Sequence, residues 1–455
     1  MTDTARQSAD AADPTGTGAP AAASTGAGLA PTGVGLSRLQ HIYREGMLGR
    51  RPVVPTDFAE LERRARRASS RIAWAYVAGG AGEGRTMRRN RAAFDRWAIV
   101  PRMAAGAVDR DLSVDLLGSR HTSPVLLAPV GAGALMGRDS DLSIARAAAA
   151  TGTGYVFSNQ GCNTMEECAA AMGDTQRWVQ LYWSKDEGLV DSLIQRAESI
   201  GAGALVVTLD TTVLGWRPQD LNLGSLPFTR GVGIAQYTSD PRFGAIVADR
   251  VAAPATKQDV RVTLSAVRAL LAMTRNHPGR FWRNLRSPLP RASVETFLDI
   301  YSNPGLSWRH LETLRERTRL PVVLKGILHP DDARRALDLG ADAIVVSNHG
   351  GRQVDNAVAS LDALVTIRDE IGPEPTLLLD SGIRTGADVF VALALGADAV
   401  LLGRPHLYGL ALAGQRGVED VIRNVMAELD LTMALTGTRD IPAITRDLIS
   451  AAPSA

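Results

Sequence analysis

LGADAIVV at residues 339–346 and LGADAVLL at residues 395–402 are near repeats of one another. In each copy a helical pattern ends at the glycine, because glycine readily adopts the backbone conformation that stops a helix. The apolar run that follows is typical of a strand buried on both faces, as the strands of parallel sheets are. Each copy therefore predicts the passage from a helix into a parallel β-strand.

The same alternation continues on both sides of these repeats, with short apolar runs separated by alanine-rich amphipathic stretches. Strands that alternate with helices predict a parallel sheet, and eight such units favour an α/β fold of the closed (β/α)₈ TIM barrel type. An open doubly wound sheet competes, but Gly131-Ala132-Gly133 after the first run lacks the third glycine of its fingerprint. The eight runs are residues 124–130, 154–158, 178–182, 204–210, 321–325, 343–347, 376–380 and 399–403.

One long segment interrupts this alternation, and another precedes it. Residues 211–320 separate the fourth run from the fifth, and a long insertion after a barrel strand falls on the catalytic face, so we expect a substrate lid there. Alternatively, the insertion is a solvent-exposed addition to the barrel or a contact between subunits. Residues 1–35 include 27 Ala, Gly, Pro, Ser or Thr residues and predict a disordered tail ahead of a barrel at 36–455. A capping-type Thr56-Asp57 predicts a first helix over residues 56–77.

Composition excludes several classes of protein. Fifty Lys and Arg residues against 48 Asp and Glu leave a net charge of +2, so nucleic acid is not an expected partner. No apolar run approaches the roughly 20 residues of a membrane span. Cys162 and Cys168 cannot form a disulfide framework, and no HExxH or paired-cysteine pattern suggests a metal site. We expect a cytoplasmic enzyme that uses no metal.

Polar residues mark the carboxyl ends of the predicted strands, where catalytic groups of TIM barrels gather. Residues two apart on a strand share a face. The pairs that share a face by this rule are Gln180 with Tyr182, Thr208 with Asp210, and Ser347 with His349. Of the seven histidines, His349 is the strongest catalytic candidate, because Asp210 ends another strand and Arg352 follows three residues later.

Two loops rich in glycine and arginine follow the last two predicted strands, at residues 380–386 and 403–405. TIM barrels commonly bind phosphate with backbone N–H groups of these loops. Arg384 and Arg404 add bidentate positive charge. Together the loops predict a phosphorylated cofactor.

The run SNHGGRQ at residues 347–353, with LKG at 324–326, DSGIR at 380–384 and GRP at 403–405, resembles the FMN-dependent 2-hydroxy acid oxidising family. The resemblance extends over residues 39–449. Within the family the chain is most similar to the lactate 2-monooxygenases, through residues 76–80, 215–218 and 227–241.

The resemblance implies FMN as the cofactor and a role for each matching residue. His349 is the implied base, Asp210 its carboxylate partner, and Tyr182 and Arg352 complete the catalytic set, as the oxidation of an alcohol next to a carboxylate requires. Tyr76, Tyr182, Arg217 and Arg352 are the implied substrate-binding residues. The implied flavin contacts are Pro129, Val130, Gly131, Ser158, Gln180, Thr208, Lys325, Ser347 and Asp380, and the implied phosphate contacts are Gly382, Arg384, Gly403 and Arg404.

The implied activity is oxidation of an (S)-2-hydroxy acid with O2, by oxidative decarboxylation to the shortened acid, CO2 and water. Alternatives are an oxidase that releases the 2-oxo acid and H2O2, an enzyme for a larger or peptide-borne substrate, and a flavin-free binding protein. Gly131 matches the monooxygenase pattern, where the missing methyl group would enlarge the space beside the flavin. Gln160 replaces an aromatic residue of several members and implies a more polar substrate pocket. A tetramer or octamer is also implied.

Overall fold

Eight parallel strands close into a barrel in the computed structural model, which describes residues 33–254 and 263–452. Each of the eight apolar runs overlaps one strand, so the predicted (β/α)₈ TIM barrel is confirmed. Pairing of the last strand with the first closes the barrel. The strands are β4 (Val125–Leu127), β5 (Gly154–Phe157), β6 (Arg177–Leu181), β7 (Leu205–Thr208), β8 (Val322–Ile327), β9 (Ala343–Val346), β10 (Thr376–Leu379) and β11 (Ala399–Leu402).

The two LGAD repeats set the register of neighbouring strands. The Asp342 carboxylate accepts a hydrogen bond from the N–H of Val322 at the start of β8 (2.7 Å), and the Asp342 N–H donates to the Val322 carbonyl (2.8 Å). Asp398 makes the same two bonds with Leu377 of β10 (2.7 and 2.8 Å). Each repeat therefore ties the strand that follows it to the strand before it in the sequence.

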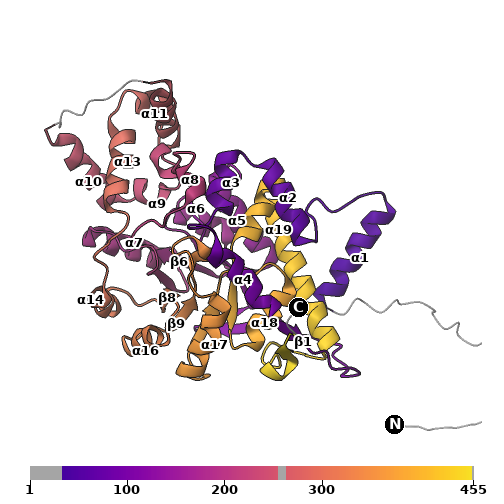
Figure 1. Ribbon diagram of the computed structural model, residues 1–455. Coiled ribbons are helices and arrows are strands. Elements are labelled where there is room, and N and C mark those ends of the chain that lie inside the picture. Colours follow the sequence, from indigo (N-terminus) through magenta and orange to yellow (C-terminus); the bar gives the residue numbers. More distant parts are fainter. Residues whose placement is uncertain (1–32, 255–262, 453–455) are drawn as a thin grey trace, which may run out of the picture. The chain divides into compact units, whose positions relative to one another are not determined.

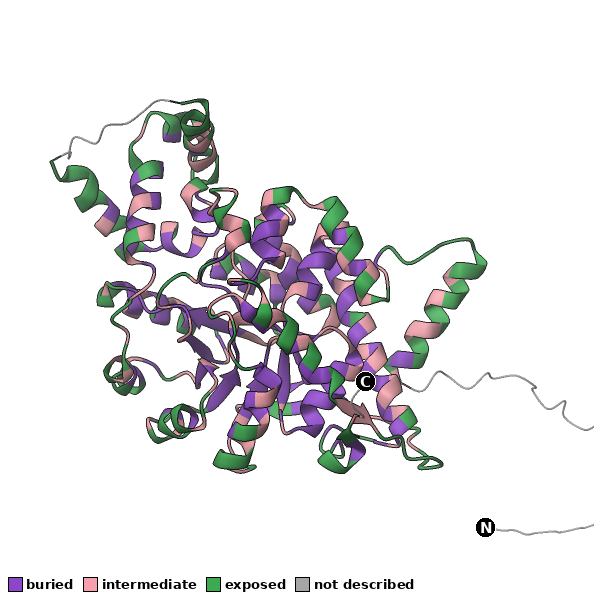
Figure 2. Ribbon diagram, viewed as in Figure 1, coloured by how far each residue is buried: buried purple, intermediate pink, exposed green. Residues whose placement is uncertain are grey.

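Helices cover the outside of the barrel. Figure 2 shows the strands buried and the outer faces of the helices exposed, as expected for strands covered on both sides. The covering helices are α5 (Ser140–Thr151), α6 (Met165–Met172), α7 (Glu187–Ser199), α14 (Trp308–Glu312), α15 (Leu314–Arg317), α16 (Pro330–Asp338), α17 (Ser360–Ile371), α18 (Gly386–Ala394) and α19 (Arg404–Thr436). The last of these is kinked at Ala413 and Gly414, where the backbone leaves helical geometry.

Four helices and three short strands precede the barrel: α1 (Val34–Met47), α2 (Phe58–Ala68), α3 (Arg71–Ala78), α4 (Arg85–Asp95), β1 (Trp97–Ile99), β2 (Val114–Leu116) and β3 (Ser119–His121). The single helix expected over 56–77 is wrong, because Ser69 is extended and Ser70 caps a new helix by accepting from the N–H of Ala73 (3.1 Å). Asp57 caps α2 as expected. Residues 1–32 of the expected tail lie outside the described residues, whereas Val34 and Gly35 belong to α1.

Residues 211–320 divide into two parts. The helices α8 (Pro218–Leu221), α9 (Ala235–Thr238), α10 (Pro241–Ala252), α11 (Leu264–Asn276), α12 (Phe281–Leu285) and α13 (Leu289–Ile300) form the insertion, and α10, α11 and α13 stand together in Figure 1. In contrast, α14 and α15 belong to the outer layer, since Arg317 pairs with Glu187 and Asp191 of α7. The insertion is therefore shorter than expected, because its last residues are the barrel's own β7–β8 crossover.

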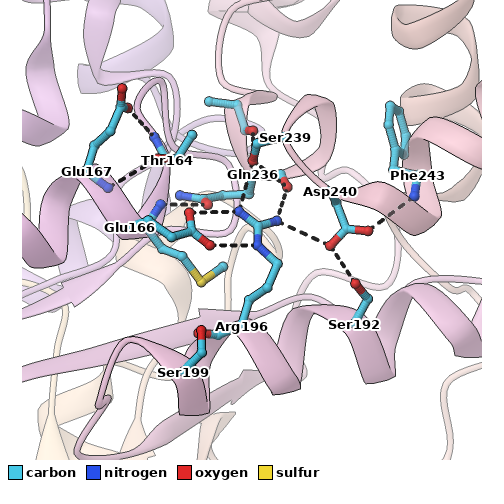
Figure 3. Close-up of polar contacts among 12 residues, drawn as sticks. Thr164, Glu166, Glu167, Ser192, Arg196, Ser199, Gln236, Ser239, Asp240 and Phe243 are labelled. Atoms are coloured by element: carbon cyan, nitrogen blue, oxygen red, sulfur yellow. Dashed lines mark hydrogen bonds and ion pairs between the residues drawn. The ribbon is translucent and has the colours of Figure 1, made fainter.

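The insertion has its own aromatic core and is fastened to two barrel helices. Phe297 packs against Tyr237 (4.8 Å between ring centroids) and Tyr301 (4.7 Å). Arg196 of α7 binds both carboxylate oxygens of Glu166 (2.8 and 3.0 Å) on α6, and it reaches Asp240 (3.2 Å) at the start of α10 (Figure 3). A buried ion pair of this kind holds the start of α10 in place.

The remaining short elements are the 3₁₀ turns η1 (Gly133–Leu135), η2 (Pro227–Arg230), η3 (His349–Gly351) and η4 (Arg446–Leu448), and β12 (Ile449–Ala451), which pairs with β1. Over residues 33–254 and 263–452, no helix is both long and apolar enough to cross a membrane. In the same ranges no group of three or more His, Cys, Asp or Glu residues could hold a metal ion.

Candidate active site

A cavity of about 1050 Å³ opens at the carboxyl ends of the barrel strands. The end of every barrel strand contributes to its wall, and residues of α3 and of the insertion complete it. The structure thus gathers most of the predicted site residues around one cavity. Those in the wall are Tyr76, Pro129, Val130, Gly131, Gln180, Tyr182, Thr208, Arg217, Lys325, His349, Arg352, Asp380, Gly382, Arg384, Gly403 and Arg404.

His349 and Asp210 form a partly buried pair, with His349 in the cavity wall and Asp210 behind it. Nδ1 of His349 lies 2.8 Å from Oδ1 of Asp210, and the Thr211 hydroxyl donates to the same oxygen (2.9 Å). Burial alone would raise the pKa of Asp210, but His349, Lys325 and Thr211 lower it to about 2. Because the ionised carboxylate only accepts hydrogen bonds, neutral His349 carries its proton on Nδ1 and has a free lone pair on Nε2.

The pKa of His349 is lowered from its ordinary value. Burial has the largest effect and lowers it, and the positive charges of Lys325 and Arg217 lower it further. The Asp210 carboxylate raises it without outweighing these effects. His349 is therefore neutral near pH 7 and is able to accept a proton.

The turn that carries His349 is built from three residues in the left-handed region of backbone space: His349 (φ 56°), Gly350 (φ 65°) and Gly351 (φ 74°). Such a conformation is rare for a residue with a side chain and is concentrated at functional sites. The Ser347 hydroxyl accepts from the His349 N–H (3.0 Å) and holds the turn. A Cβ at Gly350 would lie 2.7 Å from Nη1 of Arg404, so a larger residue would displace the end of that side chain.

Two guanidinium groups reach the cavity beside His349 without a carboxylate partner within 4 Å among the described residues. Arg217 donates to the Arg352 carbonyl (3.1 Å) and to the Gln353 side chain (2.9 Å). Arg352 lies over the ring of Tyr76 at 5.0 Å and donates through Nη1 to the backbone carbonyls of Tyr76 and Gly79. Burial and the neighbouring Arg217 lower the pKa of Arg352 to about 9. A bound carboxylate would relieve this unfavourable concentration of positive charge.

Lys325 also lines the cavity. Its Nζ contacts Oδ2 of Asp380 (2.9 Å) and donates to the Ser347 hydroxyl (2.8 Å). Burial alone would lower the pKa of Lys325, but Asp380 and Asp210 raise it, so the ammonium group stays charged in the cavity wall.

Two buried polar groups of the cavity wall have no hydrogen-bond partner among the described residues: Nε2 of Gln180 and the hydroxyl of Thr208. The N–H of Asn159 donates to Oε1 of Gln180 (2.9 Å) and thereby fixes Nε2 as the free end of the amide. Buried polar groups without a partner are costly. Both therefore indicate a polar ligand in this part of the cavity.

Arg384 and Arg404 lie at the end of the cavity where α19 begins. Burial is the main cause that lowers the pKa of both groups, to about 10 for Arg384. Among the described residues, no carboxylate lies within 4 Å of either guanidinium group. The guanidinium nitrogens of Arg404 donate to backbone carbonyls instead. With the N-terminus of α19 beside them, they suit a phosphate group.

Three predicted residues lie behind the cavity wall, because loop geometry beyond a strand end no longer follows strand alternation. Asp210 stands behind His349, Ser347 lies between Lys325 and the His349 turn, and the Ser158 hydroxyl accepts from the Gln160 N–H (3.1 Å). Wall residues that the sequence did not single out as site residues include Thr211, Leu214, Phe228 and Tyr301. The position of Thr211 next to Asp210 was an available signal, but nothing in the sequence marks Tyr301.

Gly131 does not leave open space in the cavity. A Cβ at this position would lie 2.8 Å from Cβ of Gln160 and 3.1 Å from its Oε1. The expectation of extra room beside the cofactor is therefore wrong, because the Gln160 side chain occupies that room.

Comparison with known proteins agrees with this geometry. The profile of the FMN-dependent dehydrogenase family matches residues 65–451. An FMN-dependent alpha-hydroxy acid dehydrogenase of Penicillium citrinum, qulF, is 41% identical over 407 residues, 89% of this chain and 93% of the relative. An L-lactate oxidase of Lysinibacillus sphaericus is 37% identical, over 86% of this chain and 91% of the relative.

Solved structures of a 2-hydroxy acid oxidase are also similar to this chain. Mandelate oxidase in complex with (S)-4-hydroxymandelic acid superposes with a TM-score of 0.71 and 34% identity, covering 88% of this chain and 99% of that one. The family profile matches most of the chain, and relatives at this level of identity have the same fold and the same cofactor as the chain. The chain therefore belongs to the FMN-dependent dehydrogenase family and is an FMN-dependent 2-hydroxy acid oxidoreductase.

Proposed function

We propose that the protein oxidises an (S)-2-hydroxy acid with O2 in the manner of a lactate 2-monooxygenase, with His349 as the base. The observation that carries the proposal is the free Nε2 of His349, held beside two guanidinium groups that lack a carboxylate partner among the described residues. An alcohol next to a carboxylate is the substrate that such a pair of features fits.

FMN fits the unsatisfied groups of the cavity. Gln180 and Thr208 would offer hydrogen bonds to FMN, and Pro129, Val130 and Gly131 would line its site. Arg384, Arg404 and the backbone of Gly382 and Gly403 would hold the phosphate. Lys325 places a positive charge in the same wall. Bound FMN supplies the two-electron acceptor for the oxidation.

The protein's own groups bind the substrate and move one proton. Arg217 and Arg352 bind the carboxylate, and Tyr76 and Tyr182 of the same wall orient the acid by hydrogen bonds. Nε2 of His349 accepts the proton of the 2-hydroxyl group. The resulting imidazolium is stabilised by Asp210, whose carboxylate is already ionised.

The fate of the 2-oxo acid separates two candidates. In the monooxygenase reaction, lactate and O2 give acetate, CO2 and water; in the oxidase reaction they give pyruvate and H2O2. The motif resemblance supports the first, and the L-lactate oxidase relatives support the second.

The experiment has two stages. Anaerobic mixing of the holoenzyme with (S)-2-hydroxy acids tests the half-reaction, and loss of flavin absorbance is the expected result. Aerobic turnover of the best substrate is then run with catalase, because free H2O2 decarboxylates 2-oxo acids without an enzyme. The shortened acid as main product supports the monooxygenase, whereas accumulation of the 2-oxo acid establishes the oxidase. A failure of every 2-hydroxy acid to reduce the flavin would overturn both.

The proposal includes a homo-oligomer, as the resemblance implies. Light scattering of the purified holoenzyme is expected to give the mass of a tetramer or an octamer, and the mass of a single chain would contradict it.

A further inference from the structure

Gln353 ends the SNHGGRQ run that marks the site, but the proposed mechanism gives its side chain no role. The residue is half-buried, and its side-chain amide lies against residues 209–217, which follow β7 and form no helix or strand. This segment carries Asp210 and Arg217, both of which the proposed mechanism needs in fixed positions. The contacts of this one amide therefore bear on two groups of the site.

The amide of Gln353 uses its full hydrogen-bonding capacity on this segment. Its Nε2 donates to the backbone carbonyls of Asp210 (2.7 Å) and Val213 (2.9 Å). Its Oε1 accepts from the N–H of Gly215 (3.3 Å) and from Nη2 of Arg217 (2.9 Å). A primary amide has two N–H donors and two acceptor lone pairs, so all four are used. The reversed amide would turn its oxygen toward two carbonyls, and the contacts therefore fix the orientation of the group.

The backbones of the two segments are also in close contact. A Cβ at Gly215 would lie 2.5 Å from the carbonyl oxygen of Arg352 and 2.7 Å from that of Gln353. Nε of Arg217 donates to the same Arg352 carbonyl (3.1 Å). The segment that carries Arg217 is therefore held directly against the residues that follow the His349 turn.

The distance between the carboxylate site and the base is decisive for a 2-hydroxy acid. The hydroxyl group and the carboxylate of such an acid are on adjacent carbon atoms, so Arg217 and Nε2 of His349 must match that short span. Asp210 orients the His349 ring (2.8 Å), and Gln353 bonds to both Asp210 and Arg217. A displacement of about 1 Å between reacting groups can cost about 100-fold in rate.

We infer that Gln353 is a positioning residue for the oxidation: its amide holds Arg217 and the backbone of Asp210 at a fixed separation and so sets the distance from the bound carboxylate to the base. This inference rests on the proposed function and adds a residue to it. Gln353 is not part of the cavity wall, so it acts through Arg217 and Asp210 rather than on the substrate itself.

Gln353→Met is the first test, because methionine keeps the length of the side chain and removes all four hydrogen bonds. Stopped-flow absorbance gives the rate constant for anaerobic flavin reduction and the apparent Kd of the best 2-hydroxy acid. We expect the rate constant to fall by about 10- to 100-fold, as for a misplaced substrate. The apparent Kd should rise less, because Arg352 still binds the carboxylate. A wild-type rate constant in this variant, whatever its Kd, overturns the inference.

Gln236→Met is the matched control. The amide of Gln236 also joins the insertion to the barrel side, since it accepts from the N–H of Met165 (3.0 Å) and donates to the Asn163 carbonyl (3.0 Å). Gln236 lies outside the cavity wall, so this variant should keep both kinetic constants at their wild-type values. An equal fall of the rate constant in the two variants would reflect a general loosening of the insertion and would overturn the inference.

A double-mutant cycle with Arg217→Met tests whether Gln353 acts through Arg217. In the Arg217→Met background, Gln353→Met should change the ratio of the rate constant to Kd less than it does in the wild type, because one of the groups that it positions is already gone. Equal fold-changes in the two backgrounds would mean that the residues act independently, and the inference would then be wrong.

Gln353→Glu keeps the inference testable if the methionine variant does not fold or does not retain FMN. Its carboxylate can accept from Arg217 and would give that guanidinium group an ion-pair partner. The charged groups that act on His349 are Asp210, Lys325 and Arg217, and Arg217 is one of those that lower the pKa of the imidazole. The midpoint of the pH profile of flavin reduction should therefore move to higher pH. An unmoved midpoint would show that residue 353 does not control Arg217 and would overturn the inference.

All these comparisons are made with a wild-type holoenzyme that at least one 2-hydroxy acid reduces. If no 2-hydroxy acid reduces the wild-type flavin, the proposed function itself fails, so the two failures are distinguishable.

Discussion

His349 shows how one residue depends on contacts from several parts of the chain. Its backbone is held at φ 56° by the hydroxyl of Ser347, and its ring is oriented by Asp210, which lies 139 residues earlier. The pair leaves Nε2 as the only ring nitrogen available to a ligand. A strained backbone and an oriented ring are features of a residue positioned for catalysis rather than for packing.

Replacement of this imidazole tests its role. His349→Ala is expected to retain FMN and to reduce the rate of anaerobic flavin reduction by about 100- to 10,000-fold, the usual contribution of a positioned base. Stopped-flow absorbance measures the rate. His41→Ala on the exposed face of α1 is the matched histidine control and should reduce its flavin at the wild-type rate. Normal flavin reduction in His349→Ala would remove His349 from the mechanism.

The charges around His349 predict a pH dependence. Only the neutral imidazole accepts a proton, and its pKa is below the ordinary value because of burial, Lys325 and Arg217. The rate of flavin reduction should therefore rise with pH through that lowered pKa and be constant above it. In Asp210→Asn the one neighbour that raises the pKa is lost, so the plateau should begin at lower pH while its height falls. A midpoint that moves to higher pH in this variant would contradict the assignment.

At the scale of elements, the insertion is fastened to the barrel by polar contacts rather than resting loosely on it. Arg196 donates to the Gln236 carbonyl (2.6 Å) at α9, and Gln236 in turn accepts from the N–H of Met165 (3.0 Å) at the start of α6 (Figure 3). Tyr237 donates to the side chain of Asn159 (3.0 Å), and the backbone N–H of Asn159 donates to Oε1 of Gln180 (2.9 Å). Residues 235–240 are therefore a fixed anchor, and a movement of the expected lid would have to occur elsewhere in the insertion.

The anchor predicts a difference between two arginines that join the same elements. In Arg196→Met the carboxylate of Asp240, which is fully buried, loses its ion-pair partner, so we expect a loss of about 3 kcal/mol of unfolding free energy. Arg242→Met removes a more exposed pair with Asp186 and should cost much less unfolding free energy than Arg196→Met. Denaturant unfolding of both holoenzymes measures the difference. Equal losses would show that the Arg196 network does not anchor the insertion.

At the scale of the whole molecule, the cavity joins residues from Tyr76 on α3 to Arg404 on α19. Arg404 donates to the Val77 and Gly79 carbonyls (both 3.0 Å), so the end of α3 is tied to the start of α19. The partly buried cations Arg384 and Arg404 near this junction favour an anionic ligand there.

This junction predicts that FMN stabilises the fold through its phosphate. Removal of FMN should lower the melting temperature, and FMN at about 100 times its Kd should restore about 2.7 kcal/mol of stability. Riboflavin, which lacks the phosphate, is expected to restore less. Differential scanning calorimetry of the apoprotein with each ligand measures the difference. Arg384→Met should remove most of the advantage of FMN over riboflavin, and an unchanged advantage would place the phosphate elsewhere.

The sequence by itself determined the eight-stranded barrel and the order of its units. The LGAD repeats and the apolar runs encode local structure, and parallel strands buried on both faces leave a signal that needs no knowledge of distant contacts. The strand ends then marked most of the cavity wall, because all carboxyl ends of a parallel barrel meet at one rim. These features are properties of residues that are near one another along the chain.

Tertiary structure alone decided the rest. The division of residues 211–320 between insertion and barrel follows from the ion pairs of Arg317 with α7. The position of Asp210 behind His349, and the contact between Gly131 and Gln160, follow from loop geometry at the rim. Loops beyond strand ends have no fixed periodicity, and their contacts join residues far apart in sequence. Their arrangement is therefore set by packing in three dimensions, which no local pattern records.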